Sequence, residues 1–347
     1  MILSLLSGFT PGLHSPWAGV LMLGLLKDKK GIALILTVLI TSLIVALTLQ
    51  FNEAMRSELY AAVNLRDGVK LECMARSGFD YALAVLAQDG ASKKSLDSLL
   101  EPWADSKALS SISSSLFKEG SLEIAVTDLG GMIQLNALVD KKGRYNQKQK
   151  ALLTRFLSLE QFSLNSEQVE NIVDAIKDWI DPDNEVTHFG AERAYYESLD
   201  RPYSCKNEPL ESLKELLLVR GITKELFYGT KEKPGISHYL SIYGDGKINI
   251  NTASPVVLRS LSEHLDYKMV EEMVAYRSNE ENDFSQPTWY KHVSGMSSEV
   301  SIDDLVSTSS RYFRIVSEAR QGSMSREIKG EIKRNGDSIE VLSYTVE

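Results

Sequence analysis

The sequence has little cysteine and no excess of positive charge. Its 347 residues include two cysteines, Cys73 and Cys205, which excludes a disulfide-rich scaffold and a four-cysteine zinc site. A single bridge between them stays open, because sequence spacing does not report the distance between two side chains. The formal net charge of -9 and the pI near 5.3 oppose binding to nucleic-acid phosphates and suit cations such as calcium.

Motifs typical of common enzymes are also missing. The sequence contains no Gly-rich phosphate-binding loop, no His-Glu-x-x-His and no Gly-x-Ser-x-Gly element. Its histidines are dispersed along the chain, at His14, His188, His238, His264 and His292. We therefore expect a protein that is not an enzyme.

What the chain does have is a long apolar run near its beginning. From Ile32 to Leu49 no residue is charged, and a lysine cluster, Lys27, Lys29 and Lys30, precedes the run. A helix rises about 1.5 Å per residue, so this run covers roughly 27 Å and spans a bilayer core. Because lysines favour the cytoplasmic side, we predict a transmembrane segment at 32–50, a cytoplasmic N-terminus and an outward-facing remainder.

Three interpretations of this run compete. A cleaved secretory signal needs small residues after the run, and residues 46–51 lack such a site. An uncleaved anchor fits well. The third interpretation uses Gly31, which lies directly between the lysines and the run, as in a prepilin site that is cut before Ile32 and keeps the run in the mature chain. Residues 1–31 are then a leader, and Met22 offers an alternative start.

The helical pattern continues beyond the membrane segment. No proline interrupts residues 51–86, and apolar residues recur there close to the helical period, which predicts one long helix ending near Gly90. Alternating apolar residues then predict a hairpin over 122–138, with its turn at 128–131, packed on that helix. We assign residues 51–145 to this helix and its first strands.

The middle of the chain has helical patterns and its end has strand patterns. Apolar stripes at 172–180 and 210–219 indicate helices, and we assign residues 146–245 to an inserted α-helical domain. Three strand-like runs close the chain, at 312–316, 325–332 and 339–346. Asn335-Gly336 is a hairpin turn signal between the last two. Strands interrupted by a helical region predict an α+β fold, with a C-terminal β-sheet within 281–347.

An acidic loop is the first candidate site. Its carboxylates follow the spacing of ligands one, three, five and twelve in a calcium-binding loop: Asp181, Asp183, Glu185 and Glu192. The match is imperfect, because the position that needs glycine for the sharp turn is Val186. Oxygen ligands suit calcium better than zinc, although His188 leaves a transition metal open. A solvated acidic loop that caps two helices is the alternative without a metal.

A helical module at 246–280 is the second candidate. Residues 247–254, Lys-Ile-Asn-Ile-Asn-Thr-Ala-Ser, and the helical pattern after them resemble helix-hairpin-helix or SAM-like elements of DNA-binding proteins. In those elements a glycine-bearing hairpin presents backbone N–H groups to phosphate. The corresponding stretch here, 261–266, has no glycine and carries Glu263 and Asp266. We therefore interpret the module as structural and expect no nucleic-acid partner.

Together these segments resemble general secretion pathway protein K, the K-type minor pseudopilin family of type II secretion systems. The resemblance runs from Lys27 to about Arg277 and includes the junction at Gly31. Its motifs are Asp178-Trp179-Ile180-Asp181-Pro182-Asp183, Gly190-Ala191-Glu192 with Tyr195-Tyr196, and Asn249-Ile250-Asn251-Thr252-Ala253. Leu36 supports the K type, since other pilin-like subunits carry glutamate at the fifth mature position. The segment before Met22 departs from the family pattern.

The resemblance implies a type IV pilin-like fold, a long N-terminal helix on an antiparallel sheet, with a large all-α insertion that binds calcium. It implies cleavage between Gly31 and Ile32 by prepilin peptidase, N-methylation of Ile32, and an inner-membrane protein whose bulk is periplasmic. It also implies I-type, J-type and major pseudopilin partners, and a structural role at the pseudopilus tip in protein export across the outer membrane. Two alternatives stay open: a membrane-anchored DNA receptor and a type IV pilus minor pilin.

Overall fold

A computed structural model describes residues 29–91, 96–112, 117, 119–140 and 142–347. The interpretation of a leader before Lys29, with its alternative start at Met22, lies outside the described residues. The chain divides into two compact units, one up to Asp67 and one from Gly68 onward.

One helix, α2 (Lys29–Gly90), contains the apolar run, and its continuous course confirms the predicted long helix. In the first unit the apolar side chains of residues 32–49 are exposed, and the most apolar window has a mean hydropathy of 2.8. Hydroxyl groups in the run bond within the helix; Thr48 Oγ1, for example, donates to Ile44 O at 2.7 Å. Within the described residues, α2 is the one helix long and apolar enough to cross a membrane.

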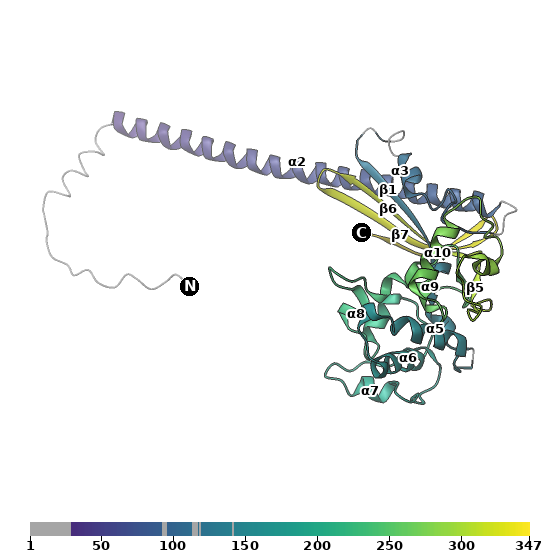
Figure 1. Cartoon of the computed structure of the whole chain (residues 1–347). Coiled ribbons are helices and arrows are strands. Elements are labelled where there is room, and N and C mark those ends of the chain that lie inside the picture. Colours follow the sequence, from purple (N-terminus) through teal and green to yellow (C-terminus); the bar gives the residue numbers. More distant parts are fainter. Residues whose placement is uncertain (1–28, 92–95, 113–116, 118, 141) are drawn as a thin grey trace. The chain divides into compact units, whose positions relative to one another are not determined.

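The second unit contains a four-stranded antiparallel sheet in the order β1-β6-β7-β8. Figure 1 labels its strands β1, β6 and β7. Its strands are β1 (Ser121–Asp128), β6 (Tyr312–Gln321), β7 (Met324–Asn335) and β8 (Ser338–Val346). The part of α2 after Gly68 packs on one face of this sheet, where Phe79 lies against Gly330 of β7. The three C-terminal strands and the turn at Asn335-Gly336 confirm the strands predicted there.

The predicted hairpin over 122–138 is wrong. β1 pairs with β6 instead, so its partner comes from the C-terminal region. At the end of β1 the Asp128 carboxylate accepts the Gly130 N–H at 2.7 Å and turns the chain out of the sheet. The next elements are the 3₁₀ turn η1 (Leu129–Gly131) and β2 (Ile133–Gln134), which pairs in parallel with β3 (Leu240–Ser241). Residues 129–311 therefore form an excursion between two adjacent strands.

A hydrophobic core of its own holds this excursion together, with buried residues from Ile133 to Val306. Its helices are α5 (Gln147–Leu157), α6 (Ser166–Ile180), α7 (Arg193–Glu197), α8 (Lys224–Tyr228), α9 (Pro255–Ser260) and α10 (Tyr267–Arg277). The 3₁₀ turns are η2 (Leu135–Leu138), η3 (Glu160–Phe162), η4 (Leu213–Leu218), η5 (Ile236–His238) and η6 (Pro287–His292). A short parallel pair joins β4 (Ile248–Asn249) to β5 (Val306–Ser307). Residues 284–306 thus belong to the helical core, and the large sheet resumes at Tyr312.

Two sequence expectations change here. The stripe at 210–219 forms only the 3₁₀ turn η4, because Ser212 starts it and Gly221, in the left-handed region at φ +86°, follows its end. The cysteine bridge that the sequence left open is absent, since Cys73 is exposed on α2, Cys205 is buried, and both thiols are free. The α+β class, the long N-terminal helix and the antiparallel sheet are confirmed.

Candidate metal site

Helix α6 carries the candidate site at its C-terminal end. A capping box of Asn165 and Gln168 starts the helix, each side chain accepting the other residue's backbone N–H. Every residue from 172 to 180 is buried, so the polar residues of this stretch lie in the protein interior. Asp178 and Asp181, in and just after the last turn, therefore point their carboxylates into the helical core rather than into water.

Three carboxylates meet at this point, those of Asp178, Asp181 and Glu192. One oxygen of each lies within 4.8 Å of the others, and all three residues are buried. The loop between α6 and α7 folds back onto Asp178, whose two oxygens accept the Thr187 N–H at 3.2 and 3.1 Å. A side chain at Gly190 would collide with the same carboxylate, so only glycine fits where the loop approaches it.

The group carries more negative than positive charge. Lys177 Nζ contacts Asp181 Oδ2 and lies 3.6 Å from Asp178 Oδ1. Burial raises the pKa of Asp178 and of Asp181 despite Lys177, and it raises the pKa of Glu192 to about 7. Asp181 Oδ1 and Glu192 Oε1 are buried without a hydrogen-bond partner among the described residues. Such oxygens are unfavourable to bury unless a proton or a cation satisfies them.

The donor set fits calcium better than zinc. Ca²⁺ binds oxygens at about 2.3–2.6 Å, so two ligands of one ion lie up to about 5 Å apart. The three carboxylate oxygens, all within 4.8 Å of one another, lie inside that reach. Softer donors are unsuited, because burial raises the thiol pKa of Cys205 to about 12, which keeps it protonated, and His188 is exposed. The residues present therefore suit a hard cation.

The structure brings together two of the four residues that loop spacing indicated. Asp181 and Glu192 belong to the group, whereas Asp183 and Glu185 are exposed, and Asp183 Oδ1 accepts the Glu185 N–H at 2.8 Å. Sequence reasoning missed Asp178, because the calcium-loop template begins at Asp181. Helical spacing could have found it, since residues three apart in a helix share a side.

A second acidic group contains an arginine that pairs with two of its three carboxylates. Asp89, Asp97 and Glu101 also bring carboxylate oxygens within 4.8 Å of one another. Arg334 donates to Asp89 Oδ2 at 2.7 Å and also to Asp97 Oδ1, and the Trp103 indole N–H donates to Glu101 Oε2 at 2.8 Å. Burial raises the pKa of Asp97 to about 6 and that of Glu101 to about 7. With Arg334 among them, these carboxylates form an internal ion-pair cluster.

The Asn249 motif belongs to a buried junction between the sheet and the helical core. The Asp128 carboxylate accepts four donors, namely Thr252 Oγ1 at 2.6 Å, Ser310 Oγ at 2.7 Å, Gly130 N–H at 2.7 Å and Asn249 Nδ2 at 2.9 Å. We call these five residues the Asp128 junction. All four donors lie in the excursion, whereas Asp128 is the last residue of β1. Because they converge on this one buried carboxylate, the junction fixes the motif against the end of β1.

The helix-hairpin-helix-like module uses its hairpin for internal contacts. Residues 261–266 join α9 to α10, and the Asp266 carboxylate caps α10 by accepting the Met269 N–H at 2.7 Å. Arg155 of α5 donates to Ser260 O and Leu261 O, at 2.7 and 2.8 Å, and so secures the end of α9. The hairpin is therefore held to α5 at its first residue, Leu261, while its residues Glu263, His264 and Asp266 are exposed.

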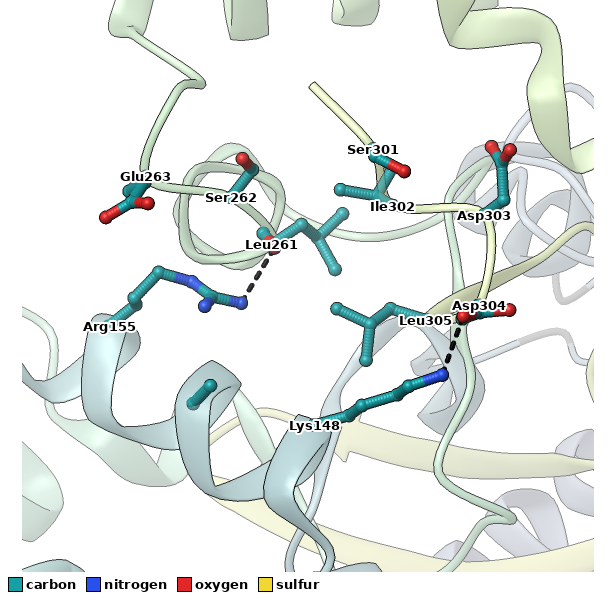
Figure 2. Close-up of a pocket in the computed structure, with 11 residues that line it drawn as sticks. Lys148, Arg155, Leu261, Ser262, Glu263, Ser301, Ile302, Asp303, Asp304 and Leu305 are labelled. Atoms are coloured by element: carbon teal, nitrogen blue, oxygen red, sulfur yellow. Dashed lines mark hydrogen bonds and ion pairs between the residues drawn. The ribbon is translucent and has the colours of Figure 1, made fainter. Parts of the chain in front are cut away.

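A cavity of about 400 Å³ lies beside this hairpin, between α5 and residues 301–305 (Figure 2). Its charged lining residues are Lys148, Arg155, Glu263, Asp303 and Asp304. Figure 2 shows Arg155 directed to Leu261 and Lys148 to Asp304, the latter pair 2.6 Å apart. Because acids outnumber bases and both bases are engaged, the cavity offers phosphate no positive field. It gives no support to the DNA-receptor alternative.

Comparisons with known proteins converge on one family. The family described as type II secretion system protein K matches residues 131–230. A type II secretion system protein K from Aeromonas hydrophila is 30% identical over 238 residues, which covers 66% of this chain and 69% of that protein. One from Klebsiella pneumoniae is 24% identical over 234 residues, which covers 65% of this chain and 67% of that protein.

A solved structure has the same fold. It is the crystal structure of the GspK-GspI-GspJ complex from the type 2 secretion system of enterotoxigenic Escherichia coli. The match has a TM-score of 0.60 at 18% identity and covers 82% of this chain and 98% of that one. At this identity the likeness shows the fold alone.

Proposed function

This chain belongs to the type II secretion system protein K family, and from that membership we propose that it is a minor pseudopilin, a structural and non-enzymatic subunit at the tip of the secretion pseudopilus. The observation that carries this proposal is α2, a single helix whose first part is apolar and of membrane length and whose last part packs on an antiparallel sheet. A type IV pilin-like subunit has this arrangement. In this role the chain supports protein export across the outer membrane without chemistry of its own.

In this proposal prepilin peptidase cuts between Gly31 and Ile32 and methylates the new amino group of Ile32. The unassembled subunit sits in the inner membrane, with its N-terminus in the cytoplasm and its bulk in the periplasm. On assembly, residues 32–49 exchange lipid for the helices of neighbouring subunits, so helix packing compensates for leaving the bilayer. Leu36 supports the tip position. Other pilin-like subunits carry glutamate at this position, and a buried glutamate needs a partner group from a neighbouring subunit. A terminal subunit has no neighbour beyond it and therefore needs no glutamate.

The proposed pilin-like body consists of residues 51–145 and the C-terminal sheet. Residues 146–245 form the inserted helical domain, and residues 246–280 form its helix-hairpin-helix-like module. The pairing of β1 with β6 supports an insertion at this place, because residues 129–311 are an excursion between two neighbouring strands. The excursion is wider than the proposed insertion, since residues 129–145 and 281–311 also belong to it. A bulky excursion suits a tip, since it would block the addition of a further subunit above it.

The proposed partners are I-type and J-type minor pseudopilins, the major pseudopilin, prepilin peptidase and the inner membrane. The related Escherichia coli protein was crystallised in a GspK-GspI-GspJ complex, which supports the first two. The apolar part of α2 supports the membrane and the helical core of a filament, because its exposed side chains need an apolar environment.

Calcium is the proposed structural cofactor, held by Asp178, Asp181 and Glu192. A bound ion would supply positive charge to these carboxylates and would satisfy the unpartnered Asp181 Oδ1 and Glu192 Oε1. The chain's own residues would then fix the loop between α6 and α7 against the end of α6. Asp183 and Glu185, which loop spacing indicated, are not among the holders in this proposal.

The mature N-terminus tests the function. In a strain with active prepilin peptidase, mass spectrometry should find a chain that begins at methylated Ile32, and secretion should depend on it. Gly31→Leu should leave the precursor uncut and abolish secretion. Gly68→Ala is the matched control on the same helix, because its added methyl meets only Arg326 Nη2, at 3.7 Å. An intact Gly31–Ile32 bond in the wild-type chain would contradict the proposal.

Thermal melting with and without calcium tests the cofactor. The wild-type chain should melt at a higher temperature with calcium than with EDTA, since an ion at about 100 times its Kd stabilises by about 2.7 kcal/mol. Asp178→Asn should lose this shift, and Asp183→Asn, an exposed neighbour outside the group, should keep it. A wild-type chain that melts alike under both conditions would rule out the site.

A further inference from the structure

Strand β8 carries an apolar strip on the face of the sheet against which α2 packs. Through its pairing with β7, the residues on that face are Ile339, Val341, Tyr344 and Val346, and we call them the β8 strip. Tyr344 meets Phe79 of α2 edge-on, with ring centroids 5.4 Å apart, which fixes the side on which the strip lies. Val341, Tyr344 and Val346 are nevertheless 46%, 42% and 45% exposed. The strip therefore has the residue pattern of a buried strand face without the burial.

The same face of the neighbouring strand is fully covered. Ile328 and Ile332 of β7, directly opposite Val346 and Val341, have no exposed surface. A helix is about 10 Å across and strands lie about 4.8 Å apart, so one helix covers two or three strands. α2 contacts β1, β6 and β7 at Gly78 and Phe79. In the part of the chain that the structure describes, β8 is left as the open edge.

The geometry of the two sheet edges indicates that the element covering the β8 strip is not another strand. Leu342 is an extra residue opposite the step from Glu331 to Ile332, and this bulge interrupts the backbone ladder that an added strand would extend. The opposite edge, β1, packs on α3 (Ser106–Ser111), where Ser110 Oγ accepts the Ile124 N–H at 2.9 Å. A helix beside α2 needs no backbone bonds to β8, only apolar contact.

We propose that the β8 strip is the docking surface for a helix of a neighbouring pseudopilin, which lies beside α2 with an apolar face toward β8. This inference rests on the proposed function, under which each neighbour brings a long helix of the α2 type. All four strip residues are uncharged, so the facing side of the partner helix must be uncharged as well. The strip thus assigns a place on this chain to one of its minor pseudopilin partners.

Site-specific photocrosslinking in the full-length chain tests the inference, in cells that also produce the other pseudopilins. A photoreactive amino acid replaces Val341 or Val346 on the strip. Matched controls replace Glu340 or Thr345, which lie on the opposite face of the same strand. Mass spectrometry of the adducts should locate a helical segment of another pseudopilin at the strip positions and none at the controls.

A charge-insertion variant adds a quantitative test. The double variant Val341→Lys/Val346→Lys should lower the amount of co-purified I-type or J-type partner by about tenfold or more, whereas Thr345→Lys should leave it unchanged. Adducts to a strand segment or to a second copy of this chain would overturn the inference. An intact partner complex without strip adducts would also overturn it and leave the proposed function standing. If no partner co-purifies with the wild-type chain, the proposed function fails as well.

Discussion

Glu101 offers a prediction in which removing a charge stabilises the protein. Its Oε2 accepts the Ser98 N–H at 3.0 Å and the Trp103 indole N–H at 2.8 Å. Burial raises its pKa from 4.5 to about 7, and the nearby carboxylates of Asp89 and Asp97 add to the effect. Glu101→Gln keeps an oxygen acceptor for both donors and removes the charge that this environment disfavours.

The sign and size of the effect of Glu101 on the free energy of unfolding follow from its protonation in the folded and unfolded chains. Below about pH 4.5 the Glu101 carboxyl is protonated in both states. As the pH rises toward 7, the unfolded chain loses this proton while the folded chain keeps it, so stability falls across that window and the loss is complete above it. The difference between the two pKa values corresponds to about 3 kcal/mol, which solvent screening at this partly exposed group lowers to about 1–2 kcal/mol.

Chemical unfolding of the detergent-solubilised full-length chain, at about pH 4 and about pH 8, is the assay. Glu101→Gln should exceed the wild type in stability by about 1–2 kcal/mol at the higher pH and should equal it at the lower pH. Glu123→Gln, an exposed acid on β1, is the control and should change nothing. A Glu101→Gln chain that is less stable than the wild type at the higher pH would refute the reasoning, because the two hydrogen bonds would then require a carboxylate.

Two further predictions concern the buried groups. Asp128→Ala removes the acceptor of four donors and should lower the free energy of unfolding by about 3–5 kcal/mol in urea titrations, and a loss under about 1 kcal/mol would contradict the Asp128 junction. Cys73 should react with a thiol reagent in the native chain, whereas Cys205 should react only after unfolding, because it is buried and its thiol pKa is about 12. Equal labelling rates in Cys73→Ser and Cys205→Ser chains would contradict that assignment.

Sequence patterns predicted the elements whose cause is local. The uninterrupted helical period after residue 50 predicts the course of α2, and Asn335-Gly336 predicts the turn between β7 and β8 because its backbone preference acts over two residues. The hairpin over 122–138 failed for the opposite reason. The strand that pairs with β1 comes from the far end of the chain, and nothing in the residues around Asp128 reports that distant partner.

The candidate site was only half predictable for a related reason. Spacing along a loop indicates ligands only when the loop takes the template's turn, and the exposed Val186 stands where that turn needs glycine. The position of Asp178 depends instead on residues 172–180 of α6 being buried on all sides, which is a tertiary property. The Asp128 junction is less predictable still, because the Asn249–Thr252 segment and Ser310 reach Asp128 from places far apart in the sequence, and no spacing rule links them to it.

The excursion from the sheet begins and ends at one point. Asp128 is the last residue of β1, Ser310 lies just before β6, and the Ser310 hydroxyl donates to the Asp128 carboxylate at 2.7 Å. The pairing of β1 with β6 therefore closes the sheet whatever the excursion contains, and the entropy of closing a loop grows only slowly with its length. Two separate hydrophobic cores result, one under the sheet and one in the excursion. Calcium at Asp178 would accordingly stabilise the helical core, while the sheet and its β8 strip stay available for a neighbouring helix with or without the ion.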